Sequence, residues 1–282
     1  MPVIVPTKED TDNIISTTDA ALKNVNTTLQ NQINALEARI TKLETPVVTP
    51  PPPTPTPTPT NLYDDFKYTE TFQVGKISSN GKWFLQYTSN GYAKTDGNGA
   101  ILAPGGTELS IYSGSVLVRS TKKFTNARIT FYITNEKQLY TKDANGNTIT
   151  PPGCHAPWPF GRYVDKWRHW YVIIGRDKVE MGKKDAPTNI TDQATIEKYQ
   201  YTLWTGPPAT PIGVRRKVTM EFIGNKFTVY IDGVLVKTLV DDGNLTSNGV
   251  KIKQSDWTTG EFGMYNEGCQ GRYELVSIET LP

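Results

Sequence analysis

The first 45 residues carry a heptad pattern of apolar positions. A leucine or isoleucine recurs every seven residues and occupies heptad position d: Ile15, Leu22, Leu29, Leu36 and Leu43. Position a is isoleucine in the second half of the segment, at Ile33 and Ile40, and polar in the first half. This seam predicts a coiled-coil helix. The alternative is one amphipathic helix packed on the rest of the protein, which the narrow apolar stripe disfavours.

The last turns of this segment indicate how many helices associate. Residues 39–44, RITKLE, resemble the short trimerisation signature of coiled coils, with Arg39 at position g and Glu44 at the following e. Isoleucine at a with leucine at d favours dimers by itself, but we give the signature more weight. The sequence therefore predicts a homotrimer whose contacts come from Leu29, Ile33, Leu36, Arg39, Ile40, Leu43 and Glu44.

Residues 46–60 form a proline-rich segment that ends the heptad pattern. They contain eight prolines, mostly alternating with threonine. Such a sequence favours the polyproline II conformation at about 3.1 Å per residue, so it spans roughly 45 Å. A ligand for a proline-reading domain is the alternative. The position between a coiled coil and a head favours an extended linker.

From residue 61 onward, short runs rich in β-branched and aromatic residues alternate with turn residues. The clearest runs are 82–88, 115–120, 127–134, 169–175, 217–223, 227–240 and 261–267, separated by sequences such as SNG, DGNG and IGN. Many short strands with frequent turns are typical of an all-β sandwich or barrel. Only residues 191–199, TDQATIEKY, read as a helix, which we interpret as a short surface insertion.

The composition agrees with this division into 1–45, 46–60 and 61–282. All 6 Trp, 14 Tyr and 9 Phe of the 282 residues follow residue 61, as expected if only the third segment has a large hydrophobic core. The net charge of +2 gives no reason to expect nucleic acid as a partner. The sequence shows no secretory signal and no apolar run long enough for membrane insertion. We therefore expect assembly in a cytoplasm, or export without a signal peptide.

Four stretches of the third segment resemble concanavalin A-like jelly rolls of the laminin-G and glucanase-like superfamily. They are YDDF at 63–66, the central strands at 158–185, the hairpin at 214–239 and the closing strands at 260–281. The likeness covers most of 61–282, and it includes bacterial polysaccharide-binding and polysaccharide-active domains. It implies two antiparallel sheets and a concave face that often binds glycans in this superfamily.

The sequence does not carry the catalytic pattern of glucanases with this fold, which is Glu-x-Asp-x-(x)-Glu on one strand. The nearest carboxylates, Glu180 and Asp185, are five residues apart and fall on opposite faces of an extended strand. A lyase could use a histidine or tyrosine base beside a cation, and the head has such residues. We nevertheless expect a binding protein, with a polysaccharide lyase or hydrolase as the alternative.

Metal and disulfide chemistry have few candidate residues. Cys154, His155, His169 and Cys269 lack the spacing of a zinc site. Calcium is common near the chain ends in the superfamily, so Asp64 or Asp65 could contribute to such a site. We expect no cofactor, with calcium possible. The two cysteines either form a disulfide or are unrelated thiols, and the sequence leaves both alternatives open.

The strongest functional indication is a group of six aromatic residues within 158–171. Alternation in RHWYVIIG places Trp170 in the core and His169 and Tyr171 on the opposite face. Sugar rings stack on aromatic faces, and their hydroxyls bind polar side chains. We expect a carbohydrate site made of Trp167, Tyr171, His169, Arg162 and Lys183. The alternative is that these aromatic residues fill the space between the sheets.

Together these features predict a trimeric viral or phage fibre or spike protein on a virion surface. Its N-terminus would bind a particle docking partner, and its heads would bind a surface glycan on a host. Two alternatives stay open, which are the enzyme on an oligomerising stalk and a decoration protein that binds nothing. A location at a cell surface or outside the cell is the alternative to the virion.

Overall fold

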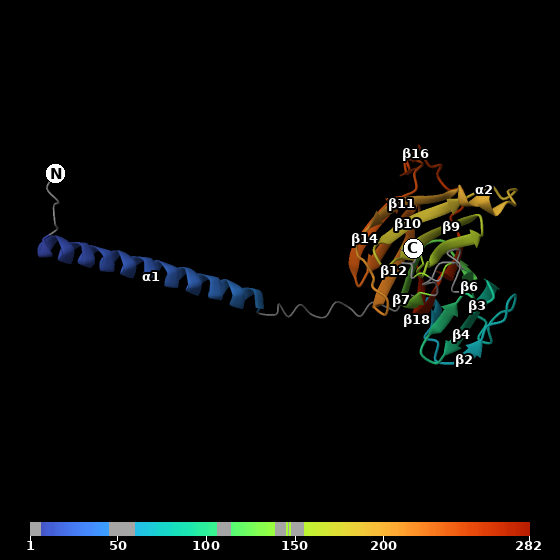
Figure 1. The fold of residues 1–282 in the computed structure, drawn as a ribbon, viewed down its shortest axis with the longest axis horizontal. Helices are drawn as coiled ribbons and strands as arrows, with labels where there is room; N and C mark the ends of the chain where they lie inside the picture. Colours follow the sequence, from blue (N-terminus) through green and yellow to red (C-terminus); the bar gives the residue numbers. More distant parts are fainter. Residues whose placement is uncertain (1–6, 45–59, 106–113, 139–144, 146, 148–154) are drawn as a thin grey trace. The chain divides into compact units, whose positions relative to one another are not determined.

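The computed structural model describes residues 7–44, 60–105, 114–138, 145, 147 and 155–282. The described chain divides into two compact units, one N-terminal and one C-terminal, with the boundary between residues 56 and 57. The N-terminal unit contains one helix, α1, at Lys8–Glu44 (Figure 1). Within the described residues, no helix combines the length and the apolarity that a membrane span requires.

Helix α1 leaves its apolar positions in contact with solvent in the single chain. The side chains that the heptad pattern places at the seam are about half exposed: Ile15 at 55 %, Leu22 at 63 %, Leu29 at 50 %, Ile33 at 46 % and Leu36 at 54 %. Arg39, Ile40, Leu43 and Glu44 belong to the helix, but their side chains lie outside the described part. The long helix agrees with the sequence, and its association stays a prediction.

The C-terminal unit is a β-sandwich of two antiparallel sheets (Figure 1). The nine-stranded sheet has the order β14-β13-β12-β7-β18-β5-β4-β2, and β1 also pairs with β18. Its strands are β1 Thr60–Asp64, β2 Thr69–Thr71, β4 Tyr92–Asp96, β5 Ala100–Ala103, β7 Ala127–Gln138, β12 Arg215–Ile223, β13 Lys226–Ile231, β14 Val234–Val240 and β18 Cys269–Thr280.

The second sheet has seven strands in the order β11-β10-β9-β8-β17-β6-β3. Its strands are β3 Trp83–Thr88, β6 Ser115–Phe124, β8 Phe160–Asp165, β9 Arg168–Ile174, β10 Val179–Asp185, β11 Gln200–Gly206 and β17 Gly260–Glu267. A small pair, β15 Thr246–Ser247 and β16 Val250–Lys251, and helix α2 at Gln193–Glu197 complete the described elements. The stretches 82–88, 127–134 and 261–267 therefore form strands as the sequence predicts.

Turn residues explain why the chain reverses where it does. In the hairpin that joins β12 to β13, Ile223 pairs with Lys226, so Gly224 and Asn225 form a two-residue turn. Asp232 and Gly233 make the next turn with positive φ angles of 53° and 82°. Asn, Asp and Gly adopt this left-handed conformation at low cost, and two such residues in succession match the twist of a tight hairpin.

The core lies between the two sheets. Each sheet contributes its inward positions, among them Phe131 and Val229 from the nine-stranded sheet and Trp83 and Phe262 from the seven-stranded sheet. Phe131 and Phe262 pack across the sandwich with ring centroids 5.2 Å apart. The alternating burial on most of these strands follows from the alternation of side chains across a sheet.

Asp64, considered above as a calcium ligand, is buried inside the head. Its carboxylate accepts hydrogen bonds from the Trp83 indole at 2.7 Å, the Asn80 amide at 2.8 Å, the Phe66 backbone at 2.9 Å and the Tyr68 hydroxyl at 3.2 Å. These donors anchor the start of the sandwich, including Phe66 with its positive φ of 54°. Among the described residues, no cluster of three or more His, Cys, Asp or Glu is placed to hold a metal.

Candidate functional site

Strand β9 separates the sandwich core from a second aromatic layer. Trp170, Val172 and Ile174 lie in the core between the sheets, while Tyr171 and Ile173 point to the outer face of the seven-stranded sheet. This agrees with the alternation expected from RHWYVIIG. The outer layer gathers aromatic and aliphatic side chains from several strands: Tyr87, Leu117, Ala156, Trp158, Phe160, Tyr163, Tyr171, Ile173 and Tyr265.

A bulge in β8 places two rings of the same strand on this outer face. The pairing of β8 with β9 shifts between Gly161 and Asp165, and Arg162 has a positive φ of 45°. An extra residue in a strand interrupts the alternation of its side chains. Phe160 and Tyr163 therefore lie on the same face and stack at 5.8 Å with an interplanar angle of 7°.

The stacked rings form one wall of a cleft with a volume of about 480 Å³. Phe160 is the centre of this wall, because it also stacks on His169 at 4.3 Å and on Tyr265 at 4.7 Å. Side chains from all seven strands of this sheet and from α2 line the cleft: Tyr87, Ser115, Trp158, Phe160, Tyr163, Lys166, His169, Lys184, Gln193, Glu197, Gln200, Tyr265 and Glu267.

Helix α2 supplies the polar rim on one side. Asp192 caps its first turn by accepting a hydrogen bond from the Thr195 backbone at 2.8 Å, and the fully buried Ile196 anchors it to the head. The next residue, Glu197, accepts from the Lys184 ammonium at 3.0 and 3.1 Å and from the amide of Gln193. The insertion predicted at 191–199 is thus part of the cleft.

Burial controls the charges inside the cleft. Desolvation raises the pKa of Glu267, and the negative charge of Glu197 adds to this rise. Two groups oppose it: the Tyr265 hydroxyl, which donates a hydrogen bond to Glu267 at 2.8 Å, and the positive charge of Lys184. Desolvation and, to a smaller extent, the positive charge of Lys184 together lower the pKa of His169 to about 3. A buried group avoids its charged form when water no longer solvates it.

His169 is consequently neutral at neutral pH, and its tautomer follows from its partner. Its Nδ1 lies 3.2 Å from the backbone carbonyl of Asp165, which accepts hydrogen bonds and cannot donate. Nδ1 therefore carries the proton, and Nε2 is left as an acceptor. His169 itself is one of the residues that line the cleft.

Tyr171 and Trp167 are the two aromatic residues of the expected carbohydrate site, and neither lines the cleft. Tyr171 is fully buried beneath the cleft, where it stacks on Trp158 at 5.6 Å and donates to Glu180 at 3.3 Å. Trp167 is half-buried, and its indole donates to the Ile190 carbonyl at 2.7 Å. It does not line the cleft, and the aromatic rings of Trp, Phe and Tyr that do are those of Tyr87, Trp158, Phe160, Tyr163 and Tyr265.

Lys183 points into the sandwich, in contrast to the expected position at the glycan face. It pairs across the strands with the core residue Trp170, and paired residues share a face. Its fully buried ammonium donates to Asp241 at 2.9 Å, to the Lys253 carbonyl at 2.7 Å and to the Ser255 hydroxyl at 2.9 Å. The next residue, Lys184, is the partner of His169 and lines the cleft.

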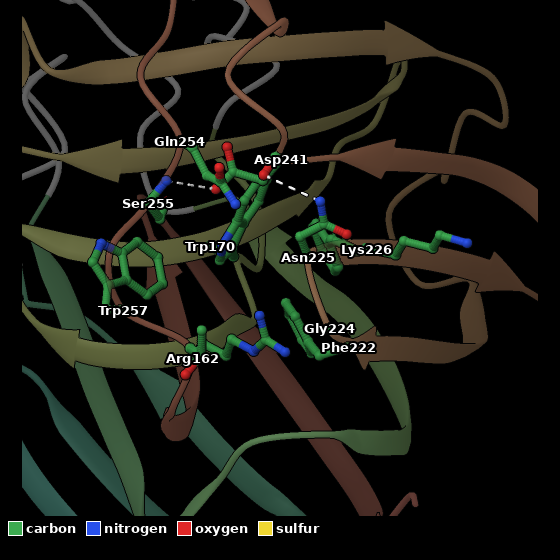
Figure 2. A pocket seen from close by; sticks show the side chains of 12 residues that line it. Arg162, Trp170, Phe222, Gly224, Asn225, Lys226, Asp241, Gln254, Ser255 and Trp257 are labelled. Atoms are coloured by element: carbon green, nitrogen blue, oxygen red, sulfur yellow. Dashed lines mark hydrogen bonds between the residues drawn. The ribbon is translucent and has the colours of Figure 1, made fainter.

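Arg162 also lies away from the cleft, because the β8 bulge turns it inward. Its Nε and Nη2 donate to the Thr125 carbonyl at 3.2 and 3.0 Å, and its guanidinium lies 5.2 Å from the centre of the Phe222 ring. Figure 2 shows this guanidinium in a separate, smaller pocket beside Trp170 and Trp257. The expected five-residue site is therefore divided between two faces of the sheet.

Sequence reasoning missed several residues of the cleft. On β17, Phe262 and Met264 lie in the core, so alternation places Tyr265 on the outer face, and this signal was present in EFGMYNE. Tyr87 and Glu197 come from segments remote in sequence, and no local pattern connects them with β9. Cys269 is fully buried, whereas Cys154 lies outside the described residues, so the question of their pairing stays open.

No protein-family model matches this sequence. No curated protein matches it either. Among solved structures, a Bacillus subtilis protein of unknown function with a galectin-like fold superposes with a TM-score of 0.52 at 10 % identity, covering 78 % of this chain and 96 % of that chain. The head has a galectin-like fold. At this identity the likeness establishes the fold alone, and it confirms the predicted jelly-roll sandwich.

Two further structures are similar at lower scores. Carbohydrate-binding module CBM66 from Bacillus subtilis has a TM-score of 0.48 at 16 % identity, covering 74 % of this chain and 99 % of that chain. The laminarinase from Rhodothermus marinus has a TM-score of 0.46 at 13 % identity, covering 78 % of this chain and 96 % of that chain.

Proposed function

We propose that the head binds a carbohydrate in the outer-face cleft, and that the chain is a trimeric viral or phage fibre or spike protein that attaches to a surface glycan. The observation that supports binding is the cleft itself, where a wall of stacked rings faces a rim of amides, carboxylates and lysines. Aromatic faces receive the C–H faces of sugar rings, and the polar rim can exchange hydrogen bonds with sugar hydroxyls.

The dimensions of the cleft support a small oligosaccharide as ligand. Its volume of about 480 Å³ lies within the roughly 300–1,000 Å³ typical of small-molecule sites. The site is lined by the C-terminal end of β17 and by α2, among other elements, so several sides of the ligand can be recognised. Polar sites of this kind replace hydrogen bonds of water by similar ones, and we expect an affinity per head of about −8 to −4 kcal/mol, micromolar to millimolar.

The trimeric arrangement rests on α1. Its seam residues are about half exposed in one chain, and burying about 25 cal/mol per Å² of apolar surface in a coiled coil would stabilise the association. The proline-rich residues 46–60 would separate the heads from the coiled coil, and the N-terminus would dock to a particle. A virion surface is the location that this arrangement favours, and a cell surface is the alternative.

Polar residues of the rim provide the most direct test of binding. Replacing Gln193 and Gln200 by alanine removes hydrogen-bonding groups without deleting core side chains, so we expect glycan binding to weaken by at least tenfold with an unchanged melting temperature. Glycan-array signals and titrations of the intact protein measure this. Tyr92→Ala, which changes an exposed aromatic residue on the other sheet, should bind normally. Equal loss in all variants would exclude the cleft as the site.

An enzyme with this fold is the second candidate, and Glu267 is the observation that favours it. Its pKa is raised by burial, and the charge of Glu197 raises it further. Two carboxylates at one cleft, one of them protonated more readily, are what glycoside hydrolysis requires. We nevertheless expect no cleavage, because Glu197 is held by Lys184 and Glu267 by Tyr265.

Product release from a panel of neutral and acidic polysaccharides tests this expectation. The intact protein should form neither reducing ends nor unsaturated sugars above the background of a Glu267→Gln variant. Release that disappears in Glu267→Gln while the variant keeps its melting temperature would replace the binding function by the enzyme. Neither binding nor cleavage by any variant would favour the decoration protein.

A further inference from the structure

The small pocket at the edge of the sandwich contains a buried guanidinium without a carboxylate partner among the described residues. Arg162 is 6 % exposed. Its only described hydrogen bonds, from Nε and Nη2, go to one neutral carbonyl, that of Thr125. No carboxylate in the described chain lies within 4.0 Å of its nitrogens. Its pKa is lowered to about 10 by desolvation, which the negative charge of Asp241 opposes only in part. A buried charge is costly unless it is paired.

The nearest carboxylate is already committed to other groups. Asp241 lines the same pocket, but its two oxygens accept from the Lys183 ammonium at 2.9 Å and from the Ser255 backbone at 2.9 Å. Asp185 lies 3.8 Å from the same ammonium, and it has no described contact with Arg162. The acidic groups at this end of the sandwich therefore balance Lys183, and Nη1 of Arg162 is left without a described acceptor.

The pocket holds room for a ligand in front of this guanidinium. Its volume is about 40 Å³, and its walls include Trp170, Phe222, Asn225 and Trp257 (Figure 2). About 10–15 Å³ of such volume is needed for one water molecule, so the space fits a few atoms and excludes a sugar ring. The aromatic walls reduce the local dielectric constant, which strengthens the attraction of an anion to the guanidinium.

The bulge that turns Arg162 inward is held rigidly. A Cβ atom on Gly260 would approach the carbonyl carbon of Arg162 to 2.2 Å, and one on Gly161 would approach the Phe222 ring to 2.2 Å. The backbone around Arg162, with its φ of 45°, is therefore closely packed on both sides. A strained and closely packed residue that presents a charged group to a cavity is typical of a ligand site.

We propose that this pocket binds one small monovalent anion, a carboxylate or nitrate in size, with Nη1 and Nη2 of Arg162 as the donors. A planar anion matches the fork of a guanidinium. Asn225 and Lys226 also line the pocket and add polar groups to it. The site is independent of the proposed glycan cleft, and its failure would leave the glycan function unaffected.

Thermal unfolding of the full chain at constant ionic strength tests the proposal. Sodium formate or nitrate should raise the melting temperature saturably, by about 2–5 °C at 100 mM, relative to sodium gluconate, whose anion is too large for the pocket. Arg162→Gln should lose this difference, whereas Arg128→Gln, which changes an arginine on the outside of the nine-stranded sheet, should keep it. Equal melting temperatures in all salts would overturn the proposal.

A second measurement is needed because Arg162→Gln could fail to fold. Crystals of the unaltered protein soaked in bromide should show an anomalous peak within about 3.5 Å of Nη1 of Arg162. Water alone at this position, after soaks in both bromide and formate, would also overturn the proposal. If the bromide peak appears in crystals without formate and is absent from crystals grown with formate, the two anions compete for one site, which supports the proposal.

Discussion

Replacing Ile33 and Leu36 of α1 by aspartate is expected to convert a trimer into monomers with folded heads. Both side chains are about half exposed in the single chain, so aspartate does not destabilise the single helix by losing a buried contact. In the coiled coil, however, each pair of helices would bury four carboxylate charges at the seam, which opposes association. Binding to a glycan-coated surface should then fall by roughly two to four orders of magnitude, while the affinity of one head is unchanged. Sedimentation equilibrium and surface binding measure the two effects.

A matched control separates charge from position. Asn34→Asp with Ala38→Asp adds the same charge to exposed positions of α1 that the heptad pattern places outside the seam. This variant should remain trimeric and bind like the unaltered protein. The trimer is wrong if the unaltered protein sediments as a monomer or dimer, and the heads are not independent units if they unfold in the seam variant.

Replacing Lys183 by methionine is expected to destabilise the head by about 3–5 kcal/mol, because it leaves Asp241 buried without its cation. The Lys183 side chain has no exposed surface, and that of Asp241 is 6 % exposed. For a domain of this size, the change corresponds to a fall of roughly 6–20 °C in melting temperature. Chemical denaturation of the full chain measures the free energy of unfolding of the head.

Lys184→Met is the control, because the same change is made one residue later on the opposite face. Its partner Glu197 is 47 % exposed, and pairs with such access to water contribute at most about 1 kcal/mol. The double variant Lys183→Met, Asp241→Asn should recover part of the loss, since it removes the unpaired charge. Equal effects of Lys183→Met and Lys184→Met would contradict the inward position of Lys183.

The expected effects connect the two parts of the proposed function. In the proposed function the cleft would give each head a weak and selective contact, and α1 would give the molecule several such contacts at once. Lys183 belongs to neither task, because it stabilises the end of the sandwich. A change at Lys183 should therefore alter glycan binding only in proportion to the unfolded fraction, which distinguishes it from changes at Gln193 and Gln200.

Local patterns determined most of the fold. The heptad spacing from Ile15 to Leu43 determined a long helix, since apolar residues every seven positions make one continuous stripe. Alternation and turn residues determined strands such as β12 and β13, because side chains alternate across a sheet and tight hairpins require residues such as Gly224 or Asp232. The same alternation placed His169 on the outer face and Trp170 in the core.

The tertiary structure alone decided the site. Arg162 turns inward because a bulge interrupts the alternation of β8, and a bulge depends on the pairing of strands that are apart in sequence. Lys183 faces the core because its register with Trp170 fixes its side. Tyr87, Glu197 and the β17 residues meet only when seven strands are ordered into one sheet. Sequence thus specified the elements and their faces, while the register and order of the strands selected which side chains share a cleft.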